Sequence, residues 1–333
     1  MKKILIIRCG ALGDLVYASS VIDALKSYYG DKTIIDFVCT PGSGTLFKND
    51  KRINQVFNLK HKKLPIFFSK EKKNIINYSK NTPYNLLINF EYGQQFKSLI
   101  YKINAKEKIG ALFNDIVIDE YTNRGEAQKL FLKSKIPQNI LNNSFPSVFT
   151  QNFTQLKSKF NLNEKYIVLS PSNSHVNRSG INYRAWPNTS WKELINILSK
   201  KIQVVIVGTS NEEKFFNKIK PFAANTLDLV GKNNIEELCT IIKYSKAVVC
   251  TDSAVGHIGA AVNTPVFVLM GPNNIITDSP YQSPTNKVNV ISLQLDCSPC
   301  YKTKVMKNCK DNICMKNISS EYVYNKIIED EII

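Results

Sequence analysis

Apolar stretches alternate with amphipathic stretches along the first half of the chain. Residues 3–8, 33–38 and 85–90 are mostly apolar and predict strands, and residues 108–110 predict a short one. Residues 14–29 predict a helix closed by a glycine, because one of its faces collects Leu15, Ala18, Ile22, Leu25 and Tyr29. This alternation of strands and helices predicts an α/β fold with a parallel sheet.

A second alternating series follows a segment with little pattern. Residues 137–163 are rich in Asn, Ser, Gln and Phe, and we expect the link between two domains there. Beyond it the predicted strands are 166–170, 203–208, 247–250 and 265–270, and the predicted helices are 191–200, 212–220 and 235–244. We therefore expect two doubly wound, Rossmann-like domains, 1–150 and 151–318, with a last helix at 319–333 that returns to the first domain.

The composition is that of a soluble globular protein. Of 333 residues, 43% are hydrophobic and 21% charged, which argues against disorder. The apolar run at the N-terminus stops at Arg8, too early for a signal peptide, and no run is long enough to span a bilayer. We expect a cytoplasmic protein.

The charge is strongly positive. Forty-four Lys and Arg against 27 Asp and Glu give a formal net charge of +17, which favours polyanionic partners such as an anionic membrane face or a phosphorylated glycolipid. An abundance of Lys, Asn and Ile is also typical of an AT-biased genome, so much of the excess can be ordinary surface lysine. With no nucleic-acid-binding motif present, we expect peripheral contact with the inner membrane face and no nucleic-acid partner.

The segment from Thr251 to Ala261 is the strongest candidate for a binding site. It lies between two predicted buried strands, and Asp252 or Ser253 can cap a short helix whose first N–H groups, on Ala254 and Val255, point outward. His257 follows one turn later. A helix N-terminus beside a histidine suits a diphosphate. The alternative is a capped helix with a core histidine.

Three other loops lie where the predicted strands end. Asp14, after Gly10 and Gly13, is either a helix N-cap or a general base. Ser172, Asn173 and Arg184 offer donors for phosphate oxygens, or form a turn-rich loop with a surface arginine. Glu213, with Glu212 as its neighbour, is either a contact for sugar hydroxyls or a helix-capping acid.

The chain resembles the glycosyltransferase family 9 heptosyltransferases over nearly its whole length. The likeness lies in Gly13-Asp14-Leu15, Arg184-Ala185-Trp186-Pro187, Leu229-Val230-Gly231-Lys232, Ile235-Glu236-Glu237-Leu238 and the segment from Thr251-Asp252-Ser253 through His257 to Gly271-Pro272. This resemblance implies the GT-B fold, in which two Rossmann-like domains face a central cleft. The first domain would bind the acceptor and the second the nucleotide sugar.

The resemblance also implies roles for single residues. Asp14 matches the proposed catalytic base, Asp252 an acid that contacts the donor sugar, and Glu213 a contact to the nucleoside ribose. Arg184 stands where the family usually has a lysine that contacts the diphosphate. The diphosphate cradle matches Ser253, Ala254 and His257, where the family more often has Thr-Gly for Ser-Ala.

On the acceptor side, the resemblance is carried by two basic residues. Phe96-Lys97-Ser98 is similar to the family's acceptor segment, and Arg124 lies downstream in a comparable region. Lys97 and Arg124 would suit a carboxylate or a phosphate on the acceptor.

Four of the eight cysteines are closely spaced near the C-terminus. Cys297, Cys300, Cys309 and Cys314 have a spacing compatible with a structural Zn or Fe site, and some family members hold iron on a similar set. Free thiols and disulfides are the alternatives. None of these cysteines is needed for the transfer chemistry.

These features together predict an inverting, metal-independent glycosyltransferase that needs no cofactor. It would move a heptose from an ADP-heptose donor to a saccharide acceptor, the lipopolysaccharide inner core. The alternatives are a heptosyltransferase with a protein acceptor, a nucleotide-sugar epimerase of the same fold that binds a UDP sugar, and a polyanion-binding protein without activity.

Overall fold

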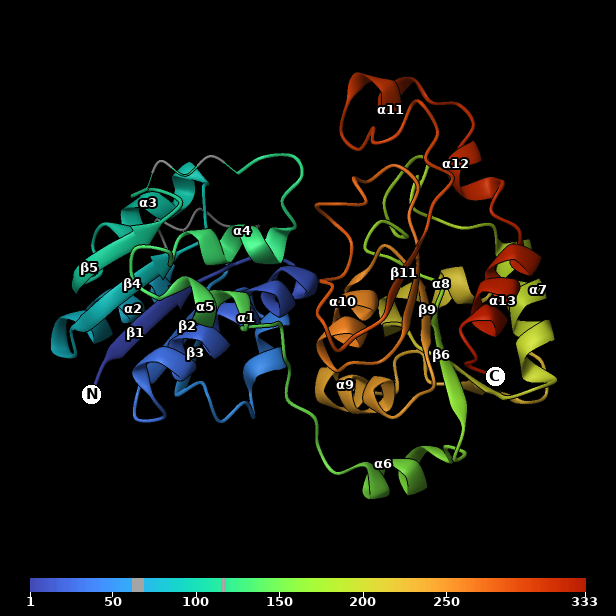
Figure 1. Cartoon of the computed structure of the whole chain (residues 1–333), viewed down its shortest axis with the longest axis horizontal. Helices are drawn as coiled ribbons and strands as arrows, with labels where there is room; N and C mark the ends of the chain where they lie inside the picture. The colour runs from blue at the N-terminus through green and yellow to red at the C-terminus, as the bar shows by residue number, and fades with distance from the viewer. Residues whose placement is uncertain (62–68, 115, 117) are drawn as a thin grey trace. The chain divides into compact units, whose positions relative to one another are not determined.

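The chain folds into two compact units, Met1–Phe149 and Thr150–Ile333. The structure is a computed structural model that describes residues 1–61, 69–114, 116 and 118–333 (Figure 1). The division falls one residue before the expected boundary between 150 and 151. Each unit has a parallel sheet and a hydrophobic core of its own.

The first unit is built on a five-stranded sheet in the order β3-β2-β1-β4-β5. Its strands are β1 (Lys3–Ile7), β2 (Ile34–Cys39), β3 (Gln55–Asn58), β4 (Tyr84–Asn89) and β5 (Ala105–Gly110). Its helices are α1 (Leu12–Tyr29), the 3-10 helix η1 (Ser43–Phe47), α2 (Lys70–Asn81), α3 (Gln94–Ile100), α4 (Arg124–Leu130) and α5 (Gln138–Asn142). Every neighbouring pair is parallel, so all five strands end at one edge of the sheet.

The second unit has a six-stranded parallel sheet in the order β11-β10-β9-β6-β7-β8. Its strands are β6 (Tyr166–Ser170), β7 (Gln203–Ile206), β8 (Thr226–Asp228), β9 (Val248–Thr251), β10 (Val266–Leu269) and β11 (Val288–Ile291). Its helices are α6 (Phe153–Phe160), α7 (Asn188–Ser199), η3 (Ser210–Glu212), α8 (Glu213–Phe216), α9 (Ile235–Lys243), α10 (Ala254–Ala261), α11 (Lys304–Asn308), α12 (Ile313–Lys316) and α13 (Ser320–Glu329). The predicted parallel α/β architecture is confirmed.

The C-terminal helix uses its apolar face inside the second unit. Val323 and Ile327 of α13 are buried in the same core cluster as Trp191 and Leu194 of α7. Figure 1 shows the two helices alongside each other. Burial against α7 thus removes the apolar face of α13 from water within the second unit, and the expected return of residues 319–333 to the first domain stays a prediction.

The sheet edges place the candidate residues. In each unit, the carboxyl ends of parallel strands lie at the same edge, and binding loops gather there. In the first unit this edge carries Arg8 after β1 and Glu91 after β4. In the second unit it carries Ser172 after β6 and Asp252 after β9.

Candidate active site

Asp14 lies in the first turn of α1. The N-cap of this helix is Ala11, so the interpretation of Asp14 as the N-cap is wrong. The Asp14 carboxylate instead accepts hydrogen bonds from the Ala11 N–H (2.8 Å) and from Arg8 Nη2 (2.6 Å). Gly10 leaves room for this carboxylate, because a Cβ at Gly10 would lie 2.4 Å from Asp14 Oδ2. The missing side chain of Gly10 thus leaves space for Asp14 itself.

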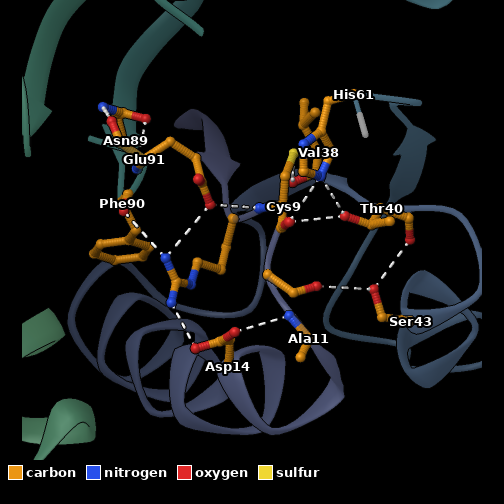
Figure 2. Close-up of polar contacts among 12 residues, drawn as sticks. Cys9, Ala11, Asp14, Val38, Thr40, Ser43, His61, Asn89, Phe90 and Glu91 are labelled. Atoms are coloured by element: carbon orange, nitrogen blue, oxygen red, sulfur yellow. Dashed lines mark hydrogen bonds and ion pairs between the residues drawn. The ribbon is translucent and has the colours of Figure 1, made fainter. Parts of the chain in front are cut away.

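Arg8 connects Asp14 to a second carboxylate, Glu91. Arg8 Nη1 lies 3.4 Å from Glu91 Oε1 and 3.3 Å from the Phe90 carbonyl (Figure 2). The same Glu91 oxygen accepts the backbone N–H of Cys9 at 2.7 Å. One guanidinium therefore holds two carboxylates at the sheet edge. Sequence reasoning missed Arg8 and Glu91, although Arg8 ends the predicted strand 3–8 and Glu91 directly follows the predicted strand 85–90.

The charge state of Asp14 results from opposing effects. Burial raises the pKa of the carboxyl, but the Arg8 guanidinium, the Ala11 N–H and the more distant Arg124 together lower it further, so the net pKa is below its ordinary value. Asp14 is therefore ionised at neutral pH. An ionised carboxylate can accept a proton.

The backbone of the loop that leads to Asp14 is held from two further strand ends. Thr40, after β2, donates from Oγ1 to the Cys9 carbonyl at 2.8 Å, and His61 Nε2 lies 3.0 Å from the same oxygen (Figure 2). Ser43 Oγ lies 3.4 Å from the Gly10 carbonyl. These contacts fix the loop before any substrate arrives.

The structure brings one of the two predicted acceptor residues near Asp14. Arg124 is the exposed first residue of α4 and is close enough to lower the pKa of Asp14. Lys97 lies half-buried on α3, and within the described part of the chain its ammonium has no ion pair or hydrogen bond. Lys97 therefore remains an available cation without a demonstrated relation to Asp14.

In the second unit, the loop after β9 forms the start of α10. Ser253 is the N-cap, yet among the residues that the structure describes it has no side-chain partner for a capping hydrogen bond. Ser253, one of the two predicted capping residues, thus stands at the N-cap position without a capping hydrogen bond from its side chain. His257 is buried one turn into α10, with 8% of its surface exposed. The first N–H groups of α10 therefore donate no hydrogen bond to the Ser253 side chain, and N–H groups at the start of a helix suit an anion.

Two predicted donor-binding residues form an ion pair. Arg184 Nε lies 3.4 Å from Asp252 Oδ2, and both side chains are largely buried. The other side of Arg184 is covered by an aromatic ring that sequence reasoning missed: the guanidinium carbon lies 4.5 Å from the centre of the Tyr301 ring. Both arrangements hold a guanidinium beside the α10 loop, since Asp252 immediately precedes Ser253.

Ser172 and Asn173 lie next to that loop. Thr251, at the end of β9, donates from Oγ1 to the Ser172 carbonyl at 3.3 Å. Asn173 is 3% exposed, and its Oδ1 accepts from the His175 N–H (3.0 Å) and from Asn182 Nδ2 (3.1 Å). Its buried Nδ2 has no hydrogen-bond partner in the described residues. A buried donor without a partner is costly, and a bound oxygen atom would satisfy it.

The two glutamates after β7 have different surroundings in the structure. Glu212 accepts the Thr209 N–H at 2.7 Å and so satisfies the start of a helical turn. Glu213 is exposed at the first position of α8. The local capping role therefore belongs to Glu212, which leaves Glu213 available to a ligand. The Gly231 N–H donates to the Gly208 carbonyl at 2.9 Å and joins this loop to the segment after β8.

The four C-terminal cysteines lie near one another without forming a metal-binding arrangement. Burial, and then the thiols of Cys300, Cys297 and Cys309, raise the pKa of Cys314 to about 11. The thiols of Cys309 and Cys314 are instead oriented toward the Asp311 carbonyl and Asn312 Oδ1, at 3.2 Å each. Across the described ranges, no three His, Cys, Asp or Glu side chains are placed to hold a metal ion.

The helices of the described residues were also assessed as membrane spans. None of them, in the part of the chain outside 62–68, 115 and 117, combines the length and the apolar character needed to cross a bilayer.

Known proteins are similar to this chain in sequence and in fold. Residues 133–310, more than half of the sequence, match glycosyltransferase family 9 (heptosyltransferase). Lipopolysaccharide heptosyltransferase 3 of Escherichia coli is 22% identical over 299 residues, which cover 81% of this chain and 84% of that protein. A glycosyl transferase family 9 protein from Veillonella parvula superposes with a TM-score of 0.81, at 14% identity, over 99% of this chain and 97% of its own. The E. coli heptosyltransferase WaaC with ADP superposes with a TM-score of 0.72, at 18% identity, over 98% and 99%. The two parallel α/β sheets are thus those of the GT-B heptosyltransferases, and the chain belongs to glycosyltransferase family 9.

Proposed function

We propose that this protein transfers a heptose from ADP-heptose to a saccharide acceptor, with inversion at the anomeric carbon. The observation that carries the proposal is the group of anion-binding donors in the second unit, which comprises Arg184, the buried Asn173 Nδ2 and the N–H groups at the start of α10. A diphosphate would satisfy all of them. The WaaC neighbours with ADP and with ADP-2-deoxy-2-fluoro heptose support ADP-heptose as donor. The lipopolysaccharide heptosyltransferase relative supports a lipopolysaccharide acceptor, for which we propose the inner core.

The proposed reaction is a single displacement. The ionised Asp14 takes the proton of the acceptor hydroxyl while the oxygen of that hydroxyl forms a bond to the anomeric carbon. The bond from the anomeric carbon to the diphosphate oxygen breaks at the same time. Negative charge grows on the leaving diphosphate, where Arg184, His257 and the α10 N–H groups stabilise it. Because the nucleophile attacks from the face opposite the leaving group, the configuration inverts. This route uses no metal ion or other cofactor.

Other residues determine what is bound. Asp252 would contact the donor sugar and Glu213 the ribose, with Ser172, Ser253 and Ala254 lining the diphosphate. Lys97 and Arg124 would bind a carboxylate or phosphate of the acceptor, and the net charge of +17 supports peripheral contact with an anionic membrane face. A hydroxyl group of a protein is the alternative acceptor, and a UDP-sugar epimerase is the alternative activity.

A structural Zn or Fe on the cysteine cluster is a separate part of the proposal. Its support is the spacing of Cys297, Cys300, Cys309 and Cys314 and the proximity of their thiols. The present side-chain arrangement does not fit a metal ion, so binding would require the thiols to converge. Elemental analysis of the purified protein tests this part: about one Zn or Fe per chain supports it, and none contradicts it.

The Asp14→Asn variant tests the proposed reaction. It keeps the shape of the side chain but removes the base, whose loss typically costs about 10²–10⁴ in rate. We expect transfer from ADP-heptose to core oligosaccharide, followed by mass spectrometry, to fall by this factor, while calorimetry shows nearly unchanged ADP affinity.

Two controls make the result decisive. Asp31→Asn changes an exposed carboxylate just after α1 and should have no effect. Turnover of the Asp14→Asn variant at the parent rate would exclude the base role. Binding of UDP as tight as that of ADP would support the epimerase alternative.

A further inference from the structure

Arg184 is held on two sides by groups of different chemistry. Asp252 contacts it through Nε at 3.4 Å, and the Tyr301 ring covers its guanidinium carbon at 4.5 Å. A carboxylate attracts any cation, whereas an aromatic face pairs best with a planar, delocalised one. The ring therefore fixes the plane of the guanidinium and leaves its edges for other partners.

Tyr301 is itself held in place by two loops of the second unit. Its N–H donates to the Pro272 carbonyl at 2.9 Å, in the loop that follows β10. Its Oη lies 3.3 Å from His175 Nε2, in the loop that follows β6. Because both the backbone and the hydroxyl of Tyr301 have hydrogen-bond partners, its ring has little freedom. The guanidinium beside this ring is therefore ordered before a ligand binds.

The cysteine-rich segment carries Tyr301 and is fastened to the residue next to Arg184. Tyr183 donates from its hydroxyl to the Cys309 carbonyl at 3.1 Å, and Asn312 Nδ2 donates to the Tyr183 carbonyl at 3.0 Å. On the other side of Tyr301, Ser298 donates from Oγ to the Gly271 carbonyl at 3.0 Å, so the segment between Ser298 and Asn312 is attached on both sides of Tyr301. These contacts stabilise the loop that bears Arg184.

The surroundings of this pair are strongly cationic. Burial, and then the charges of Arg184, Arg178 and Lys302, lower the pKa of His175 to about 4, so its imidazole is neutral at neutral pH. Asp252 supplies one negative charge beside Arg184. The cations that remain favour a dianionic group at this position.

We propose that Tyr301 is a positioning residue that holds the Arg184 guanidinium as a planar clamp for the diphosphate of the donor. This inference rests on the proposed function and extends it. It explains why an arginine stands at position 184, where the resemblance to the family implies a lysine: an ammonium has no plane for the ring to fix, and it cannot bind two phosphate oxygens in parallel. Arg184 and Tyr301 thus form one functional pair.

A double-mutant cycle tests the pair. The parent, Arg184→Lys, Tyr301→Leu and the double variant are compared by calorimetry with ADP and by the KM for ADP-heptose. We expect Tyr301→Leu to weaken ADP by about 2- to 30-fold, the range of a cation–π contact. Arg184→Lys should cost much less ADP affinity in the Tyr301→Leu background than in the parent, since an arginine has less advantage over a lysine once the ring is absent. The KM should rise more than kcat falls.

Two controls separate positioning from folding. Tyr301→Phe keeps the ring and loses the hydroxyl, so it should restore most of the ADP affinity that Tyr301→Leu lacks. Tyr322→Leu removes a tyrosine that covers Lys326 on α13, a similar cation–ring pair elsewhere in the same unit, and should leave ADP affinity unchanged. Melting temperatures of the unliganded variants show whether each is folded.

The outcomes distinguish this inference from the proposed function. Additive effects of the two substitutions, or parent affinity in Tyr301→Leu, would overturn the pairing of Tyr301 with Arg184. An Arg184→Ala variant with unchanged ADP affinity would instead overturn the diphosphate role of Arg184. If Arg184→Ala weakens ADP while Tyr301→Leu does not, the proposed function stands and the positioning role fails.

Discussion

The role of Asp14 depends on its neighbours more than on its own chemistry. Burial alone would raise the pKa of this carboxyl and favour the neutral form, which cannot accept a proton. Arg8, shared with Glu91, reverses the balance. The guanidinium thus keeps the proposed base ionised, and it does so at some cost in basicity.

The Arg8→Gln variant should therefore move the pH dependence of transfer. Without the guanidinium, one of the groups that lower the pKa of Asp14 is lost, so this pKa rises and the acid limb of kcat/KM shifts to higher pH. Protonation would then reduce activity where the parent is fully active. A pH–rate profile measures the shift. Arg8→Lys, which keeps the positive charge, is the matched control, and an unmoved acid limb in Arg8→Gln would contradict this account.

Whether these neighbours can be found from sequence depends on distance along the chain. Asp14 was identified because it opens a predicted helix after a glycine loop. Arg8 and Glu91 are 83 residues apart, and their contact depends on β1 lying beside β4. Local patterns do not determine that order of strands. Tyr301 and Arg184 are joined in the same way, by a segment whose path has no sequence signature.

At the scale of elements, central strands were predicted well, whereas the edge strand β5 was predicted only in part and the other edge strands were missed. The predicted strands 3–8 and 166–170 nearly coincide with β1 and β6, whose residues are almost all buried. The structure adds β3, β8 and β11, short strands at or next to the sheet edges whose residues are mostly half-exposed. Such strands need no continuous apolar run, so hydrophobic patterning does not reveal them. The predicted helix 212–220 is similarly reduced to α8, Glu213–Phe216.

The loop between β1 and α1 leads to a prediction about Gly10. In Gly10→Ala the new Cβ would lie 2.4 Å from Asp14 Oδ2 and 2.5 Å from Asp14 Cβ, which is too close, so the carboxylate must move. Small misplacements of a reacting group can cost about 10²-fold in rate. We expect a loss of that order in kcat, measured with ADP-heptose and core oligosaccharide.

The same variant contains its own control. Because Gly10 belongs to the first unit and the proposed diphosphate contacts to the second, ADP affinity measured by calorimetry should not change. Full activity of Gly10→Ala would show that the position of Asp14 does not limit transfer.

At the scale of the whole molecule, the chain carries a formal net charge of +17. Its two units have separate sheets and cores. A charge of this size creates a field that attracts anionic surfaces and weakens as salt is added. Each basic residue close to an anionic bilayer contributes about 1 kcal/mol. The proposed peripheral attraction to an anionic membrane would require no apolar insertion.

Binding to vesicles should consequently depend on both lipid charge and salt. We expect the protein to sediment with vesicles that contain phosphatidylglycerol at about 0.05 M salt and to be released near 1 M, where the Debye length falls to about 3 Å. Neutral phosphatidylcholine vesicles are the matched control. Equal binding to both lipids, or retention at high salt, would exclude an electrostatic association.

The separation of Asp14 from the donor contacts governs how the protein can change over time. Every side chain proposed to touch the diphosphate belongs to the unit Thr150–Ile333, and Asp14, Lys97 and Arg124 all belong to Met1–Phe149. Each unit buries its own core, so a substitution in one core leaves the packing of the other intact. Under this proposal, variants that escape an ADP-mimicking inhibitor through altered contacts are expected to carry substitutions in the second unit. A lineage that acquires a new acceptor can instead do so by mutation of the first, with its donor unchanged.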